Sequence, residues 1–340
     1  MIDDCSTGDP SERMNARCHS PEAIKSVGDT PSVSVVVPTR NRPDVVVRAV
    51  RSALAQSLTP HEVIVVVDGP DSATVRALEA LGDARVVVHE LEENGGAARA
   101  RNIGVRNSTG DWVAFLDDDD EWLPAKLYAQ VQRAASAAGT RRLVLGSGIE
   151  LRRDSTVVRW PLRSPGDHER ICNYLFVRRR PGEGLLATPT IMLRRELALS
   201  CPFPEHLRNH EDYDWMIRLE QAGAHFDVVL EPLVIVNAPS ARTSLSSSIQ
   251  WEASLAWALS RKSDLSPRAF SDFCLTELAD IARTSDGGFR AKVIILLVAS
   301  AGEINWFSLA RFVALSLLPA GIRRRLSAKA AAGANCRRHA

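Results

Sequence analysis

The sequence predicts an α/β protein with a mixed, mostly parallel sheet flanked by helices, followed by a helical C-terminal extension. Two observations predict this class. Short β-branched apolar runs alternate with segments whose apolar residues recur at helical spacing, an order typical of parallel strands joined by crossover helices. Polar and acidic residues directly follow several of these runs, at the edge where such sheets bind ligands.

The first half of the chain shows the alternation most clearly. Residues 32–39 (SVSVVVPT) form a continuous apolar run, typical of a strand buried on both faces. The helical spacing then begins at Pro43, a residue suited to the first turn of a helix. The expected order is strand 32–39, helix 43–57, strand 62–67, helix 72–82, strand 85–89, helix 97–107 and strand 112–116.

The later chain is less regular. We expect strands over 142–160, 188–193 and 228–236, the last interrupted at Pro232. We expect helices over 211–222, 250–262 and 268–284. Because the strand signals stop near residue 243, the predicted organisation is a flexible polar arm (1–31), a sheet domain (32–243) and a helical extension (244–340).

Composition and charge restrict the class of protein. Hydrophobic residues make up 45% of the 340 residues, which is typical of a globular chain. Lys and Arg number 42 against 41 Asp and Glu, so the net charge is +1 and no global positive field favours nucleic acid as a partner.

The cysteines and the N-terminus indicate a reducing compartment. Six scattered cysteines, with no CxxC pair, are expected to be reduced thiols: Cys5, Cys18, Cys172, Cys201, Cys274 and Cys336. The polar first residues do not resemble a secretory signal. The longest uncharged tracts, 293–302 and 312–322, are shorter than the roughly 18 residues of a membrane span. We therefore expect a cytoplasmic protein.

Five consecutive acids, Asp117 to Glu121, follow the strand expected at 112–116. Such a cluster is electrostatically costly unless a positive group offsets it, and carboxylate oxygens are the ligands of hard divalent cations. Asp117 and Asp119, two residues apart in an extended turn, would point to the same side. The alternative is a solvated turn in which Asp120 caps a helix beginning near Leu123.

Other polar residues stand at expected strand ends. Asp68 follows the strand at 62–67 and could accept hydrogen bonds from a ligand, or it could be an ordinary turn residue. The segment 39–42 (TRNR) could supply donors to a nucleotide, or form a simple polar loop. Asn94, Gly95 and Gly96 lead into a helix N-terminus, where backbone N–H groups can hold an anion.

A second acidic group opens the helix expected at 211–222. Glu211, Asp212 and Asp214 exceed what capping requires, because one carboxylate is enough. A carboxylate in a partly desolvated cleft can act as general base toward a hydroxyl. The alternative is a first turn whose acids complement the helix dipole.

Five motifs in this order are similar to those of the family 2 glycosyltransferases, which have the Rossmann-like GT-A fold. They are PTRNRP (38–43), VDGPD (67–71), NGGAARARNIG (94–104), GDWVAFLDDDDEW (110–122) and HEDYDWMIRL (210–219). The resemblance covers about residues 33–240. It implies an inverting transfer of one sugar from a nucleotide-diphosphate sugar, most often a UDP-sugar, with Mn²⁺ or Mg²⁺ bound.

The resemblance also implies roles for individual residues. Donor or nucleotide binding falls to Pro38, Thr39, Arg40, Asn41, Asp68, Gly96, Arg101, Asp117 and Asp118. Asp117 to Asp119 match the DxD motif, with Asp119 as the metal ligand and Asp117 as a second candidate. Asp212 matches the catalytic base, with Glu211 beside it.

The chain departs from the polymer-forming members of the family. It lacks a QxxRW motif and flanking transmembrane helices, which favours transfer of a single sugar to a saccharide, a lipid-linked acceptor or a small molecule. Two alternatives are a metal-dependent nucleotidyltransferase and a non-catalytic nucleotide-sugar-binding protein. The first should carry a Gly-rich phosphate loop after its first strand, and residues 38–43 contain no Gly.

The C-terminal segment 291–326 mixes apolar stretches with arginines. One interpretation is a helical hairpin that packs on the catalytic domain. The other is an amphipathic surface in peripheral contact with an anionic membrane, at its inner face.

Overall fold

The computed structural model describes residues 31–137, 139–140, 142–153, 156–237, 250–284 and 288–317. The strands are β1 (Val33–Thr39), β2 (Glu62–Val67), β3 (Val86–Glu90), β4 (Trp112–Phe115), β5 (Asp120–Trp122), β6 (Leu143–Arg153), β7 (Thr156–Trp160), β8 (Met192–Arg194) and β9 (His225–Asn237).

Helices connect and follow these strands. They are α1 (Pro43–Leu54), α2 (Ser72–Glu79), α3 (Ala97–Asn107), α4 (Lys126–Ser136), α5 (Ile171–Phe176), α6 (Arg195–Ser200), α7 (Glu211–Gln221), α8 (Trp251–Ser260), α9 (Pro267–Phe273), α10 (Ala279–Thr284), α11 (Gly288–Ala299) and α12 (Trp306–Leu317). A 3₁₀ turn, η3 (Thr188–Thr190), precedes β8, and a π-helical turn, η5 (Cys274–Leu278), joins α9 to α10.

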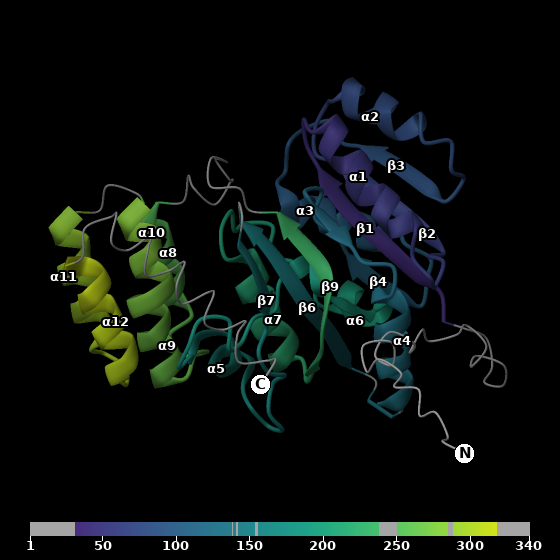
Figure 1. The fold of residues 1–340 in the computed structure, drawn as a ribbon. Coiled ribbons are helices and arrows are strands. Elements are labelled where there is room, and N and C mark those ends of the chain that lie inside the picture. The colour runs from purple at the N-terminus through teal and green to yellow at the C-terminus, as the bar shows by residue number, and fades with distance from the viewer. Residues whose placement is uncertain are drawn as a thin grey trace, which may run out of the picture. The chain divides into compact units, whose positions relative to one another are not determined.

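Within the described part of the chain, nine strands form one sheet in the order β3-β2-β1-β4-β8-β6-β9-β5, with β7 paired to β6. Strands β3, β2, β1 and β4 are mutually parallel, as are β6 and β9, whereas β5, β7 and β8 pair antiparallel (Figure 1). The prediction of a mixed sheet with a parallel core is confirmed.

Successive side chains of β1 divide the core between the two faces of the sheet. Val35 packs in one cluster with Val46 and Val50 of α1, whereas Val36 belongs to the cluster on the other face, which α3 covers. Helix α3 lies so close that a Cβ on Gly104 would meet the Val36 side chain at 2.4 Å. The β-branched run is therefore buried on both faces, as its composition predicts.

The C-terminal helices share the core of the α3 face. The Phe273 ring of α9 packs edge-on against Phe176 of α5, with centroids 5.1 Å apart. Helix α11 contributes a buried stripe of Ala291, Ile295 and Ala299 to the same cluster. The predicted packing of this segment on the domain is observed for α11.

Three local expectations differ from the structure. Asp120 does not cap a helix: it begins β5 and pairs with Val236 of β9, and α4 starts only at Lys126. Residues 188–193 form a 3₁₀ turn before β8 rather than one strand. Strand β9 continues through Pro232, because the register shifts beside Gly148, where backbone atoms of β9 come too close for any side chain.

Several expectations lie outside the described residues. These are the flexible arm over residues 1–30, the domain boundary near 243 and the segment after 317. In the described ranges, no helix has both the length and the apolar character to cross a membrane. Cys172, Cys201 and Cys274 are buried free thiols.

Candidate active site

The carboxyl ends of β1, β2 and β4 meet at one edge of the sheet, because these strands are parallel neighbours. Thr39 ends β1, Asp68 follows β2, and the acidic cluster follows β4. The sheet order thus gathers three segments that the sequence separates.

Arg42, at the start of α1, offsets part of the negative charge of the acidic cluster. The Thr39 hydroxyl and Arg42 Nη1 each donate to Asp118, both at 2.8 Å, and the same Nη1 lies 3.2 Å from Asp119 Oδ2. Burial raises the pKa of Asp118 although Arg42 opposes the shift. Asp118 is therefore fixed by the protein, whereas Asp117 and Asp119 are more exposed to solvent.

Arg101 joins the two acidic stretches. From α3, its Nη2 donates to Asp117 at 2.8 Å, and its Nη1 lies 3.6 Å from Glu211 Oε1 at the start of α7. Burial alone would lower the pKa of Arg101, yet the neighbouring carboxylates raise it, so the guanidinium is charged. Its Nε and Nη1 are buried and make no hydrogen bond to any described residue.

Asp212 follows Glu211 and lies in the field of the same arginine. Burial and the adjacent Glu211 carboxylate raise the pKa of Asp212 to about 7, whereas Arg101 opposes the shift. The backbone N–H of Tyr213 donates to its Oδ1 at 2.8 Å. A carboxyl group with a pKa near neutrality is suited to accept a proton and to release it again.

Asp214, in the same helical turn, has a structural role. Its carboxylate accepts hydrogen bonds from Arg261 Nε at 2.6 Å, Arg261 Nη2 at 2.9 Å and Trp257 Nε1 at 3.2 Å. Nearby, His210 Nε2 lies 2.8 Å from Ser254 Oγ, and burial lowers the pKa of His210 to about 4. Helix α8 therefore holds the start of α7 in place.

Asp68 organises the loop before α3. One carboxylate oxygen accepts from the Gly95 N–H at 2.7 Å, and the other accepts from Asn94 Nδ2 and the Gly96 N–H, both at 2.8 Å. Asp68 thus already occupies the Gly95 and Gly96 amides in this structure. The expectation that backbone N–H groups at this helix N-terminus hold an anion, and the donor-binding role of Gly96, stay predictions. The predicted contact of Asp68 with a base stays a prediction.

The remaining predicted donor residues lie at the end of β1. Pro38 is buried in β1, in register with Val66 of β2. Arg40 follows and is exposed. Asn41 has a positive φ of 52° and donates its backbone N–H to Asp71 at 2.8 Å. These residues line the sheet edge beside the acidic cluster, and their contacts with a donor stay predictions.

The acidic cluster fits part of a divalent-cation site. Its donors are carboxylate oxygens, which suit Mn²⁺ or Mg²⁺. No three His, Cys, Asp or Glu side chains of the described residues already converge as a complete metal centre. A cation here would be held by one or two carboxylates, and water and substrate phosphates would complete its coordination shell, as is usual for Mg²⁺.

The sequence suggested Arg42 only as a possible donor to a nucleotide, not as the partner of the acids, and it did not single out Arg261. A usable signal existed for Arg42, since five adjacent acids require nearby positive charge and the loop beside them contains two arginines. No comparable signal exists for Arg261, which is far along the chain in a segment without a motif.

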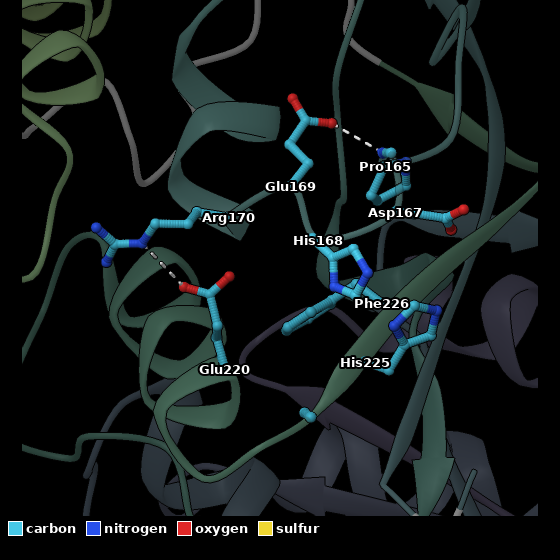
Figure 2. A pocket seen from close by; sticks show the side chains of 10 residues that line it. Pro165, Asp167, His168, Glu169, Arg170, Glu220, His225 and Phe226 are labelled. Carbon is cyan, nitrogen blue, oxygen red and sulfur yellow. Dashed lines mark hydrogen bonds and ion pairs between the residues drawn. The ribbon is translucent and has the colours of Figure 1, made fainter. Parts of the chain in front are cut away.

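A hollow lies away from the acidic cluster, at the opposite edge of the sheet, where β9 begins at His225 beside the start of β6 (Figure 2). It measures about 480 Å³ and is lined by residues 165–170, Glu220 and 224–226. Two of its acids have partners: Glu169 accepts from the Gly166 N–H at 2.9 Å, and Glu220 lies 3.7 Å from Arg170. It contains none of the predicted site residues.

Comparison with known proteins agrees with this geometry. The family model described as Glycosyl transferase family 2 matches residues 34–200. The amylovoran biosynthesis glycosyltransferase AmsB of Erwinia amylovora is 34% identical over 211 residues, which span 59% of this chain and 68% of AmsB. The succinoglycan biosynthesis protein ExoO of Rhizobium meliloti is 41% identical over 118 residues, 35% of this chain and 33% of ExoO.

Solved structures share the fold. Residues 1–349 of S. aureus TarS superpose with a TM-score of 0.55 and 20% identity, covering 76% of this chain and 75% of that one. The complex of the same protein with UDP-GlcNAc gives a TM-score of 0.52, covering 79% and 72%.

Proposed function

Because this chain belongs to glycosyl transferase family 2 and is a glycosyltransferase, we propose that it moves one sugar from a UDP-sugar to an acceptor hydroxyl with inversion of the anomeric centre. The observation that carries the proposal is the meeting of two acidic stretches at Arg101, one following β4 and one opening α7. A nucleotidyltransferase would need only the first of these.

The choice of UDP rests on the fold neighbour, since TarS has been solved with UDP-GlcNAc and with UDP. In this chain the donor lies along the edge formed by Thr39, Asp68 and the acidic cluster. We propose that Arg101, whose Nε and Nη1 are buried and make no hydrogen bond to a described residue, donates to phosphate oxygens of the bound donor.

The proposed metal ligands are Asp119 and Asp117, whose side chains are partly exposed to solvent. A bound Mn²⁺ or Mg²⁺ would supply Lewis-acid stabilisation of the leaving diphosphate. The protein contributes further positive charge near this position through Arg42 and Arg101, which balance the carboxylates when no diphosphate is present.

Asp212 is the proposed general base. It takes the proton of the acceptor hydroxyl as that oxygen forms a bond to the anomeric carbon, and the bond from that carbon to the phosphate oxygen breaks with release of UDP. The raised pKa of Asp212 makes it a better proton acceptor than an exposed carboxylate. Glu211 forms an ion pair with Arg101, and its negative charge raises the pKa of Asp212.

The relatives' names support a proposal for the acceptor class. AmsB and ExoO are named for amylovoran and succinoglycan biosynthesis, and we propose that a saccharide hydroxyl, free or lipid-linked, is the acceptor here. The chain spans one third of ExoO, so a correspondence of whole-protein activity is itself part of the proposal.

The proposed function can be tested directly by measuring the release of UDP or GDP from a panel of nucleotide sugars in the presence of Mn²⁺. We expect slow, metal-dependent release from a UDP-sugar. Asp212→Asn should lower turnover by about 10²–10⁴-fold, the usual contribution of a general base, with donor binding retained. Asp119→Ala should abolish metal-dependent donor binding.

Asp83→Asn is the matched control, since this partly exposed carboxylate pairs, among the described residues, with the neighbouring Arg85 and should leave turnover unchanged. Full turnover in Asp212→Asn would remove the base assignment. Release from none of the nucleotide sugars by the folded wild-type chain would overturn the proposed function.

A further inference from the structure

Helices α11 and α12 carry a second apolar face that no described residue covers. Phe289 is 82% exposed and Leu297 66% on α11; Trp306 is 81% exposed and Leu317 78% on α12. We call the exposed apolar side chains of the two helices the outer face. They are Phe289, Val293, Leu296, Leu297, Trp306, Phe307, Val313 and Leu317.

The spacing shows that this face is distinct from the packed one. On α11, Phe289, Val293 and Leu297 recur every fourth residue, and so do the buried Ala291, Ile295 and Ala299 on the other side. A helix that is apolar on both sides is normally covered on both.

A hydrogen bond joins the two helices that carry the outer face. Lys292 of α11 donates from Nζ to the Ser316 carbonyl of α12 at 3.2 Å, which ties the end of α12 to the first turns of α11. Figure 1 shows the pair at the yellow-green end of the described chain. Neither helix is long enough to cross a bilayer, so a membrane could only receive this face in its interfacial plane.

The charge of the segment selects one occupant. Residues 288–317 contain three basic residues against a single acid, Glu303. Of the three, Arg290 is exposed on α11, whereas Lys292 donates to Ser316 and Arg311 lies 3.5 Å from Asp280. Residues 318–340 contain six Arg or Lys and no Asp or Glu. Each basic residue held near an anionic lipid surface strengthens binding about fivefold, whereas two copies of this segment in a symmetric dimer would bring like charges together.

We propose that the outer face of α11 and α12 docks on the surface of an anionic phospholipid bilayer. The aromatic rings of Phe289, Trp306 and Phe307 enter the headgroup region, where tryptophan in particular is favoured, and the basic residues after 317 supply the electrostatic attraction. The docking does not depend on the transfer reaction, so it can be tested without a sugar donor.

Flotation of the full chain with vesicles tests the proposal. Vesicles of phosphatidylglycerol and phosphatidylcholine should bind it, and pure phosphatidylcholine should bind at least about tenfold less. The triple variant Phe289→Ser, Leu297→Gln, Trp306→Gln should lose at least about tenfold in binding to the anionic vesicles. A second variant, Arg323→Glu, Arg324→Glu, Arg325→Glu, should lose binding and show a weaker dependence on salt.

The matched control is Val87→Gln, Leu199→Gln, Leu230→Gln, which alters three exposed apolar side chains of the sheet domain and should bind as the wild type does. Absence of vesicle binding by the wild type, or equal binding by the outer-face variant and the control, overturns the proposal. A wild-type dimer that the outer-face variant dissociates, with no vesicle binding, also overturns it and assigns the face to a second copy.

Discussion

Removing the positive charge of Arg101 should destabilise the protein more at high pH than at low pH. Arg101 lies 2.8 Å from Asp117 and 3.6 Å from Glu211, which corresponds to attractions of about 6 and about 5 kcal/mol at an effective dielectric constant of ~20. Much of this attraction energy offsets the free-energy cost of burying the guanidinium. The measured loss for Arg101→Met should therefore be about 3–5 kcal/mol, the usual result of breaking a buried pair.

The pH dependence has a defined sign. Asp212 already has a pKa raised above its ordinary value, and loss of Arg101 raises it further. A carboxyl group whose pKa is higher in the folded state binds more protons there, so the free energy of unfolding falls as pH rises from the ordinary pKa through the raised one. The deficit of Arg101→Met relative to wild type should be smaller at pH 5 than at pH 8.

Urea unfolding followed by tryptophan fluorescence at both pH values measures this deficit. Adding Asp117→Asn to Arg101→Met should recover part of the loss, because the unpaired carboxylate is removed. A loss below about 1 kcal/mol, or the same loss at pH 5 and pH 8, would refute the view that Arg101 balances both acidic stretches.

Three further outcomes follow from the site. The turnover of the wild type should rise with pH through about 7 as Asp212 loses its proton, and a pH-rate profile without an inflection near neutrality would contradict its role as base. Asp68→Asn removes charge-assisted hydrogen bonds to the Gly95 and Gly96 amides and should cost about 2–3 kcal/mol in urea unfolding; a cost below 0.5 kcal/mol, as for roughly neutral surface changes, would show that the loop is held otherwise. Arg261→Met leaves the buried Asp214 carboxylate without its main partner and should cost about 3–5 kcal/mol, whereas unaltered thermal unfolding would contradict the docking of α8 on α7.

The local pattern of apolar residues was sufficient to predict the parallel half of the sheet. The run Val33 to Val37 is buried on both faces, and α3 spans Ala97–Asn107 as its apolar spacing predicts. These elements depend on side chains close together in sequence, so a short window contains the information. Asp120 was a different case: its short strand exists only because Val236, far along the chain, lies opposite.

The candidate site divides in the same way. The sequence determined which chemical groups are available: the acids after β4, the acids opening α7 and the fold family to which they belong. Only the tertiary structure decided which of them act on one another. It put Arg101 between Asp117 and Glu211, raised the proton affinity of Asp212 and assigned Asp214 to Arg261 instead of to the site. The physical reason is that residue types are read locally, whereas charge balance and burial depend on distances that the order of the strands and the packing of distant helices set.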